Sequence, residues 1–308
     1  MKKKVSVIGA GNVGASLAQM IVQGGIADVV LYDIAEGVPQ GKALDLAEAC
    51  PLWGSSSSII GTNDYAPTEG SDIIVITAGL ARKPGMSRDD LLSANAKIVA
   101  EVAEKTSRLS PRAIMIAVTN PMDVMAHVSL KVSGFEPERV MGMGGVLDAA
   151  RFRTFVAWEL KVSSEDVEAL VCGGHGDQMV PMPRFTTVRG VPVTELLSEE
   201  RVQALVDRTR NGGAEIVALL KTGSAYYAPA ASTYQMVESI ILDKKRMMPC
   251  SAYLNGEYGA KGIYMGVPVI VGRSGIEKIV ELKLNEQEKS DFDTSAAAVA
   301  SLVRKLHL

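Results

Sequence analysis

The sequence predicts an α/β fold in which a doubly wound parallel sheet is followed by an α+β domain with antiparallel strands. In the first half of the 308 residues, short apolar runs alternate with helical patterns, which is typical of parallel βαβ units. In the second half, longer helical segments surround strand-like pieces, which is typical of an α+β arrangement. The pattern changes near residues 142–146, and we expect domains at residues 1–144 and 145–308.

The strands expected in the first half are continuously apolar and rich in β-branched residues, as strands buried on both faces tend to be. They span residues 5–8, 29–32, 73–77 and 114–118, with a further strand near 139–141. The expected helices span residues 12–24, 40–49, 89–108 and 122–133. This alternation predicts parallel strands that are joined by helical crossovers.

In the second half, we expect helices at residues 146–159, 198–220, 224–242 and 286–307. Strand-like pieces lie at residues 167–172, 184–193, 248–254 and 263–271. Pro192 and Pro268 fall inside two of these strands. Because proline has no N–H to donate to a neighbouring strand, we expect edges or irregular ends at both places.

The composition is that of an ordinary soluble globule, with 47% hydrophobic and 22% charged residues. The net charge of -3 and the absence of a basic run argue against a nucleic-acid partner. The three cysteines, Cys50, Cys172 and Cys250, are far apart and form no CxxC pair, so a reducing compartment is expected. Glycines interrupt the first apolar run, and no stretch reaches the roughly 18 apolar residues of a membrane span. We therefore expect a cytoplasmic protein.

A dinucleotide site is predicted at the first strand–helix junction. Gly9, Ala10, Gly11, Asn12, Val13 and Gly14 form GxGxxG directly after a strand and at the start of a helix. The glycines allow a tight turn, close approach to a diphosphate and close helix–strand packing, and the helix N-terminus attracts the phosphates.

Asp33 follows at the end of the second strand, where its carboxylate can accept from a ribose hydroxyl, although it could also cap a turn. Residues 34–36 include no arginine for a 2′-phosphate, which favours NAD over NADP. Together these features indicate a Rossmann-type domain.

Two other strand ends should face the same crevice, because ligands of open α/β sheets bind beyond the carboxyl ends of the strands. By position, both segments contact the cofactor: Thr77, Ala78 and Gly79, and Val118, Thr119 and Asn120. An alternative role for Asn120 is the N-cap of the helix that follows Pro121.

The segment from Gly79 to Leu92 carries Arg82 and Arg88 on a loop with proline and glycine, which suits a surface segment that closes over a ligand. Taken alone, the composition favours a solvated basic loop in which Ser87 caps the next helix.

A second motif places Asp148 and Arg151 at positions i and i+3, on one helix face. They form either a surface ion pair of little value, or a site in which Asp148 orients His175 and Arg151 binds a substrate carboxylate. His175 lies between Gly174 and Gly176, which permit close approach to a ligand, but a lone histidine is more often structural.

The segments GAGNVG, ARKPGMSRDDLL, VTNP, GVLDAAR and GGHGDQMVP occur in this order, with Asp33 between the first two. Over most of its length the chain thus resembles the lactate/malate dehydrogenase superfamily, and within it the lactate-dehydrogenase-like bacterial malate dehydrogenases. KTGSAYYAPA, residues 221–230, is also similar to the malate branch. The resemblance implies NAD-dependent oxidation of (S)-malate to oxaloacetate, a place in the tricarboxylic acid cycle, and a homotetramer or homodimer.

The resemblance also implies a role for each site residue. Arg82 sets the substrate class, because an arginine there matches a second carboxylate, whereas the lactate branch has a neutral residue. No metal is expected, and His127 and His307 match no family role. By the same resemblance, His175 is the proton acceptor and Asp148 is its partner. Arg151 binds a carboxylate, and Arg88 polarises the substrate oxygen. The resemblance also implies that Asn120 orients the substrate and that Asn95 contacts the cofactor.

Three other functions remain as alternatives. Arg82 argues against a lactate dehydrogenase. An NAD-dependent glycosidase would need a metal-binding Cys/His set, and position 119 is threonine. A non-catalytic NAD-binding sensor would have no need to keep His175, Asp148 and the arginines together.

Overall fold

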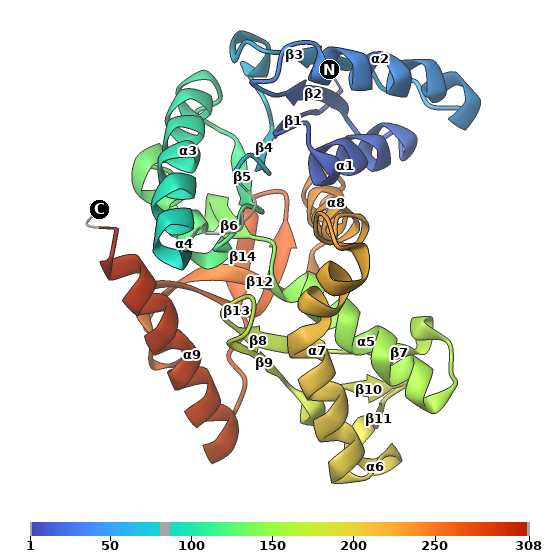
Figure 1. The fold of residues 1–308 in the computed structure, drawn as a ribbon, viewed down its shortest axis with the longest axis vertical. Coiled ribbons are helices and arrows are strands. Elements are labelled where there is room, and N and C mark those ends of the chain that lie inside the picture. The colour runs from blue at the N-terminus through green and yellow to red at the C-terminus, as the bar shows by residue number, and fades with distance from the viewer. Residues whose placement is uncertain (1, 81–86, 307–308) are drawn as a thin grey trace.

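The structure is a computed structural model that describes residues 2–80 and 87–306, with the side chain of Arg88 left out. Its main sheet confirms the predicted α/β fold class (Figure 1). The parallel part of this sheet has the strand order β3-β2-β1-β4-β5-β6. These strands are β1 (Lys4–Ile8), β2 (Asp28–Tyr32), β3 (Ile59–Thr62), β4 (Ile73–Ile76), β5 (Ile114–Ala117) and β6 (Val140–Gly142).

The first-half helices are α1 (Asn12–Gln23), α2 (Val38–Ala49), α3 (Arg88–Leu109) and α4 (Met122–Ser133). Each lies within two residues of its predicted ends, as do the five predicted strands. Helices α3 and α4 bury their apolar residues on one face of the parallel sheet, and α1 packs on the other.

Strand β3 was missed, because a four-residue strand that contains Gly61 has a weak signal. A Cβ at Gly61 would lie 2.1 Å from the Pro39 carbonyl oxygen, so glycine lets α2 approach the sheet here.

The second half extends the same sheet in antiparallel fashion. Strand β12 (Arg246–Asn255) pairs with β6 through Ser251 and Gly142, and β13 (Lys261–Gly272) pairs with β12. Beyond β13 lie β8 (Val171–Gly173), β9 (Met179–Pro181) and β14 (Gly275–Ile279). A separate sheet has the order β11 (Val191–Pro192), β10 (Thr187–Val188) and β7 (Val167–Glu168). The antiparallel strands confirm the predicted second architecture, whereas the division at residues 144 and 145 stays a prediction.

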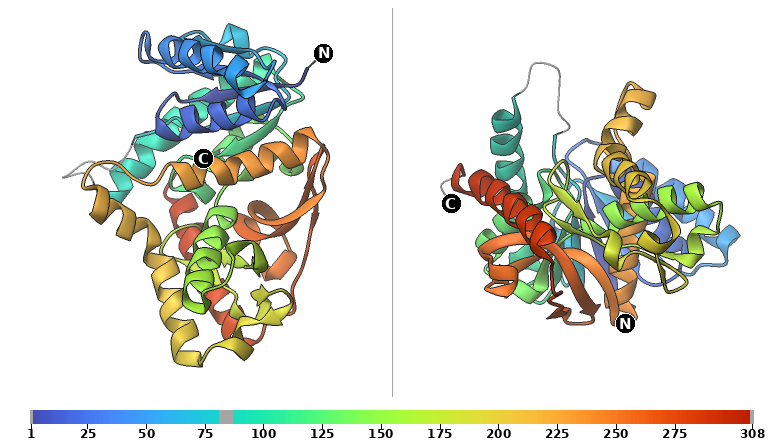
Figure 2. Two further views of the ribbon diagram at one scale, coloured as in Figure 1. Left: turned by 90° about the vertical axis from the view of Figure 1, so that its right-hand side faces the viewer. Right: turned by 90° about the horizontal axis from the view of Figure 1, so that it is seen from below.

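The later helices are α5 (Gly145–Leu160), α6 (Val193–Leu196), α7 (Glu199–Leu220), α8 (Tyr227–Ile241) and α9 (Glu286–Arg304). Helix α8 runs alongside α1, and α9 lies against α4 and β13 (Figures 1 and 2). Short 3₁₀ helices connect other elements at Cys50–Trp53, Ala66–Thr68, Pro137–Arg139, Ser164–Asp166, Pro183–Phe185 and Glu257–Gly259. Among the described residues, no helix is both long enough and apolar enough to span a membrane.

Several second-half expectations were wrong in detail. The expected strands at 167–172 and 184–193 each divide into two short strands, and β9, β14 and α6 were missed. The expected helix at 224–242 begins only at Tyr227, two residues before Pro229, since proline is tolerated in a first turn but not further inside a helix.

The two strand prolines differ in their surroundings. Pro192 lies on the edge strand β11, as expected. The expectation for Pro268 was wrong, because β13 is an interior strand and Pro268 lies opposite Pro249. The Pro268 carbonyl accepts from the Val280 N–H at 2.9 Å, on the flank where the partner of β13 changes from β8 to β14. A missing N–H is tolerated at such a change of partner.

Candidate active site

The turn after β1 forms a cradle for a dinucleotide. Gly9 has φ +114°, and a Cβ there would lie 2.6 Å from Thr77 Oγ1, so only glycine lets the ends of β1 and β4 meet. A Cβ at Gly14 would lie 1.8 Å from the Gly9 carbonyl oxygen, which fits close helix–strand packing. At Gly11 a Cβ would meet nothing within 4 Å, and this residue caps α1 without a side-chain hydrogen bond. The open N-terminus of α1 therefore fits the diphosphate of NAD.

Asp33 lies at the end of β2 and reaches this turn. Its Oδ2 accepts from the Ala10 N–H at 2.7 Å, and its Oδ1 accepts from the Ala35 N–H at 2.9 Å. The second bond is the turn role that the sequence left open, and the first brings the carboxylate to the glycine turn. The two interpretations of Asp33 are thus compatible.

A cleft of about 300 Å³ continues from the cradle between β2 and α3. Its lining includes Tyr32 and Tyr65, whose rings stack with centroids 4.1 Å apart. Thr77, Ala78 and Gly79 also line this cleft. An apolar cleft beside an acid and an open helix N-terminus has the chemistry needed for an adenosine diphosphate group.

The ends of β4 and β5 meet as predicted, and Asn95 of α3 holds them together. Thr119 Oγ1 donates to the Ala78 carbonyl at 2.6 Å. Asn95 Oδ1 accepts from the Leu80 N–H at 2.7 Å, and its Nδ2 donates to the Asn120 carbonyl at 2.7 Å. Because Asn95 is buried and bonded to protein on both sides, a direct contact with the cofactor stays a prediction.

The proposed N-cap role of Asn120 was wrong. The N-cap residue of α4 is Pro121, and no side chain caps this helix. Asn120 is exposed, and its side chain makes no hydrogen bond to any residue within the described ranges. It therefore remains available to a ligand at the carboxyl end of β5.

A histidine–carboxylate pair forms where β8 ends beside α5. His175 Nδ1 lies 2.8 Å from Asp148 Oδ2, and their side chains are 12% and 2% exposed. Burial disfavours the charged imidazolium, but the negative charge of Asp148 and its hydrogen bond outweigh burial and raise the pKa of His175. The contact leaves Nε2 as the ring nitrogen available for proton transfer.

Arg151 brings a buried positive charge to the same place. Its Nη1 lies 3.3 Å from Asp148 Oδ1, and its side chain is 13% exposed. Its Nε is buried and has no hydrogen-bond partner among the described residues. Burial lowers the pKa of the guanidinium, an effect that Asp148 partly offsets. The alternative of a surface ion pair was therefore wrong. A buried guanidinium with an unused donor suits an anionic ligand.

Two glycines inside α7 lie beside this arginine. A Cβ at Gly212 would lie 3.1 Å from Arg151 Cδ, and one at Gly213 would lie 3.6 Å from its Nη2. Glycine within a helix costs about 1 kcal/mol relative to alanine. We therefore attribute Gly212 to the room that the Arg151 side chain requires, whereas a Cβ at Gly213 would make an ordinary van der Waals contact.

The arginine loop is only partly described. Arg82 lies outside the described residues, as does His307. Arg88 is the first residue of α3, but its side chain also lies outside the described part. The predicted cap is confirmed, because Ser87 and Asp90 form a capping box at the start of α3.

Asp123, a buried acid on α4, was not predicted from the sequence. Its Oδ2 accepts from the His175 N–H at 2.7 Å, and its Oδ1 accepts from the Ser251 hydroxyl at 2.5 Å. Burial raises the pKa of Asp123, although both hydrogen bonds oppose this shift. An acid among the apolar residues of the first turn of α4, in the segment MDVM, was the signal that could have indicated it.

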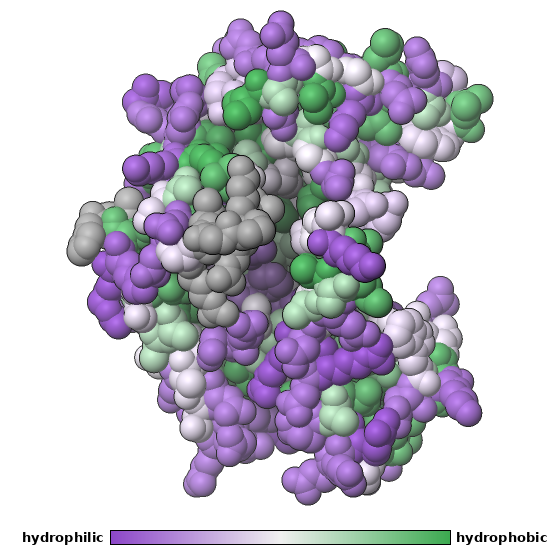
Figure 3. Space-filling model, in the orientation of Figure 1, coloured by the Kyte–Doolittle hydropathy of each residue, from purple (hydrophilic) through white to green (hydrophobic). Residues whose placement is uncertain are grey.

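The turn that carries His175 has a second support from α9. The Gly174 N–H donates to Ser295 Oγ at 2.8 Å, and Ser295 is buried. Two consecutive N–H groups of the turn are thus held by side chains from α4 and α9. The face of the molecule in Figure 3 is hollowed at its centre.

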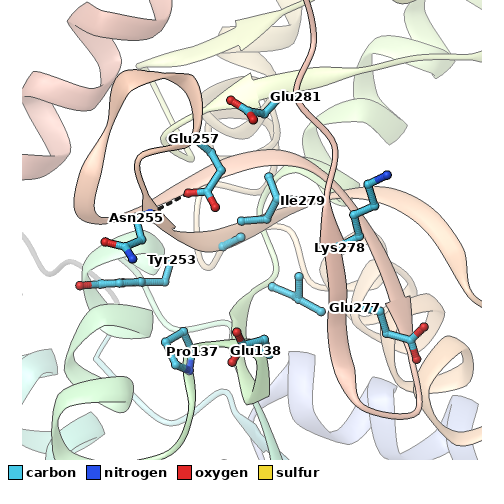
Figure 4. A pocket seen from close by; sticks show the side chains of 11 residues that line it. Pro137, Glu138, Tyr253, Asn255, Glu257, Glu277, Lys278, Ile279 and Glu281 are labelled. Atoms are coloured by element: carbon cyan, nitrogen blue, oxygen red, sulfur yellow. Dashed lines mark hydrogen bonds between the residues drawn. The ribbon is translucent and has the colours of Figure 1, made fainter.

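A separate cleft of about 400 Å³ lies along β12 and β14 (Figure 4). Four glutamates line it, and three of them already have protein partners. Glu257 accepts from the Asn255 N–H, Glu281 accepts from the Tyr258 N–H, and Glu277 pairs with Lys245. None of the predicted site residues lines this cleft, so it is not a candidate active site.

Two models of known protein families match this chain. Residues 3–142 match the NAD binding domain of lactate/malate dehydrogenase, and residues 145–306 match its alpha/beta C-terminal domain. The chain is 57% identical to malate dehydrogenase of Roseiflexus sp. (strain RS-1), over 99% of each sequence. It is 58% identical to malate dehydrogenase of Rhodopirellula baltica, over 98% of this chain and 96% of that protein.

Solved structures are similar along the whole chain. Malate dehydrogenase of Cryptosporidium parvum has a TM-score of 0.97 at 44% identity and covers 100% of this chain and 99% of its own. Malate dehydrogenase of Salinibacter ruber has a TM-score of 0.95 at 50% identity, over 99% and 97%. Lactate dehydrogenase of Cryptosporidium parvum, complexed with lactic acid and nicotinamide adenine dinucleotide, has a TM-score of 0.96 at 45% identity, over 100% and 98%.

Proposed function

The chain belongs to the lactate/malate dehydrogenase family, and from that premise we propose that it is an NAD-dependent malate dehydrogenase. The single observation that carries the chemistry is the buried group of His175, Asp148 and Arg151. It offers a proton acceptor and an anion-binding guanidinium within one hydrogen-bonded cluster. The cradle at Gly9–Gly14 and the acid at Asp33 support NAD as the cofactor.

The reaction oxidises (S)-malate to oxaloacetate. NAD, when bound, accepts the hydride that leaves C2 of malate. Neutral His175 accepts the hydroxyl proton at Nε2, so the new carbonyl carries no charge, and in the reverse direction the imidazolium returns that proton. Asp148 accepts from Nδ1–H, which fixes the tautomer and stabilises the imidazolium electrostatically.

The arginines bind and polarise the substrate in this proposal. Arg151 binds the C1 carboxylate, Asn120 orients the substrate, and Arg88 stabilises negative charge on the C2 oxygen during reduction. Arg82 pairs with the second carboxylate. With lactate, Arg82 would be buried without a partner, which costs on the order of several kcal/mol and gives roughly 10³-fold discrimination. The unpaired charge of Arg82 therefore disfavours the lactate dehydrogenase alternative.

We further propose a homotetramer or homodimer, a cytoplasmic location, a place in the tricarboxylic acid cycle, and separate cofactor and substrate domains that meet at residues 144 and 145. Some large apolar side chains lie on the surface, where a second subunit could cover them. Trp158 of α5 is 63% exposed, and Tyr227 of α8 is 68% exposed.

The test is a steady-state panel of oxaloacetate and pyruvate, each with NADH and with NADPH, followed by NADH absorbance. We expect rapid oxidation of NADH with oxaloacetate and far slower oxidation with pyruvate or NADPH. A preference for pyruvate would favour a lactate dehydrogenase. Cofactor binding without turnover of either keto acid would favour the sensor.

A further inference from the structure

Lys42 of α2 contacts the dinucleotide turn, although neither the sequence motifs nor the proposed mechanism gives it a role. Its Nζ donates to the Ala10 carbonyl at 2.6 Å. Ala10 is the residue between Gly9 and Gly11, and its N–H is the one that donates to Asp33 Oδ2 at 2.7 Å. Both polar backbone groups of Ala10 are therefore held by charged side chains, an ammonium on one and a carboxylate on the other.

Lys42 forms no ion pair with an acid in residues 2–80 and 87–306, the part of the chain that the structure describes. The partner of its ammonium is a neutral carbonyl. An ammonium has three N–H donors, so two remain for other acceptors. Lys42 is also partly buried, which weakens the screening of its charge by solvent.

Asp33 is the acid bonded to the opposite side of the Ala10 peptide, and the helix that begins at this turn adds no second one. The first turn of α1 contains no acidic residue, and the position of a Gly11 side chain is open space. The open N-terminus of α1 and the Lys42 ammonium, which contacts the same turn from α2, attract a doubly charged diphosphate together.

We propose that Lys42 is a cofactor-positioning residue, which holds the Ala10 peptide through its carbonyl and attracts the diphosphate of NAD with its charge. The inference rests on the proposed function, because it assumes that the cradle receives NAD. It predicts that Lys42 acts on cofactor affinity and leaves the chemical step unchanged.

Three variants separate the two parts of this role. Lys42→Met removes both the hydrogen bond and the charge but keeps a long apolar stem. Lys42→Gln keeps an N–H donor without the charge, and Lys42→Arg keeps both. Lys2→Met is the matched control, because Lys2 is an exposed lysine whose Nζ lies 3.5 Å from Ser56 Oγ.

The measurement is the Kd for NADH from its fluorescence, without substrate, at about 0.01 M and about 0.15 M salt, where the Debye length falls from about 30 to about 8 Å. ADP-ribose and adenosine serve as competing ligands with and without the diphosphate. We expect Lys42→Met to raise the Kd for NADH about tenfold at low salt and less at high salt. The Kd for ADP-ribose should rise in parallel, that for adenosine should not change, and Lys42→Arg should restore most of the affinity.

An NADH Kd for Lys42→Met within about twofold of the parent would overturn the proposal. So would equal losses for adenosine and ADP-ribose, or a loss that does not depend on salt, because either would indicate a distorted turn. Thermal unfolding of each variant, compared with Lys2→Met, tests that the fold is intact. If the parent protein binds no NADH, the proposed function fails first, and this inference fails with it.

Discussion

Replacing Asp148 with asparagine tests the histidine–carboxylate pair directly. Asparagine has almost the same shape, so it keeps an oxygen near His175 Nδ1 and removes the negative charge. The distance from Asp148 Oδ2 to His175 Nδ1 is 2.8 Å, and the Asp148 side chain is 2% exposed. Solvent therefore cannot compensate for the loss of the negative charge. Asp148→Asn therefore changes the electrostatics of the pair more than its packing.

The size of the effect follows from this contact. A hydrogen bond to a charged group contributes about 1.5–3 kcal/mol, and each 1.4 kcal/mol corresponds to about a tenfold change in rate. We expect kcat/KM for oxaloacetate to fall by about 10- to 100-fold. The affinity for NADH should not change, because Asp148 makes no contact with the cradle.

The pH profile gives the second readout. Asp148 raises the pKa of His175 against the effect of burial, and reduction of oxaloacetate requires the imidazolium. In the parent, kcat/KM for oxaloacetate therefore falls as the pH rises through this pKa. The asparagine variant lowers the pKa, so the falling limb moves to lower pH. Malate oxidation requires neutral His175, so its rising limb moves to lower pH as well.

The assay measures initial rates in both directions by NADH absorbance, from about pH 5 to about pH 10. Asp45→Asn is the control, because Asp45 is an exposed acid on α2 and its loss removes the same charge elsewhere. If the limbs of the pH–rate profiles lie at the same pH in Asp148→Asn and in the parent, Asp148 does not raise the pKa of His175, and the reasoning is refuted. An equal shift of the pH profile in Asp45→Asn would indicate that the change in net charge causes the effect.

Variants at three further residues test other parts of the site. His175→Asn should bind NADH normally and lose hydride transfer by about 10²- to 10⁴-fold, and comparable turnover would rule out its acid–base role. Arg82→Gln should lower malate turnover by roughly 10³-fold while activity with lactate or pyruvate rises, and an unchanged preference would contradict its role in specificity. Asp123→Ala should cost about 1–3 kcal/mol in the free energy of unfolding, because it leaves the buried His175 N–H without an acceptor. Calorimetry should show a smaller loss for Asp123→Asn, which keeps the acceptor, and equal losses would contradict that explanation.

The regular elements of the cofactor half could be predicted because their signals are local. A continuous apolar run or a helical period is contained in the segment itself, and α4 was predicted at both ends. The missed strands β3, β9 and β14 are short, and each is stabilised by a partner distant in the sequence. The course of β13 through Pro268 likewise depends on which strands flank it.

The site shows the same division between local and long-range information. The glycine turn and Asp33 form a motif within one βαβ unit, so their spacing was readable. The contact between His175 and Asp148 joins residues from two segments, and the resemblance to a family, not periodicity, indicated it. Asp123 and Lys42 act through hydrogen bonds to the backbone of other segments. Every residue type has a backbone carbonyl, and every type except proline has a backbone N–H, so no sequence pattern marks the recipient of such a bond.

The pairing of β12 with β6 affects how the molecule can move and unfold. Hydrogen bonds between β6 and β12 join the first half of the chain to the second half. One apolar core also includes Val7 from the first half and Cys250 from the second half. A rigid-body hinge near residues 142–145 would break both, so large swings between the halves are disfavoured. Unfolding should therefore be one cooperative event. In a fragment that ended at residue 144, β6 would be an unpaired edge strand and therefore prone to aggregation.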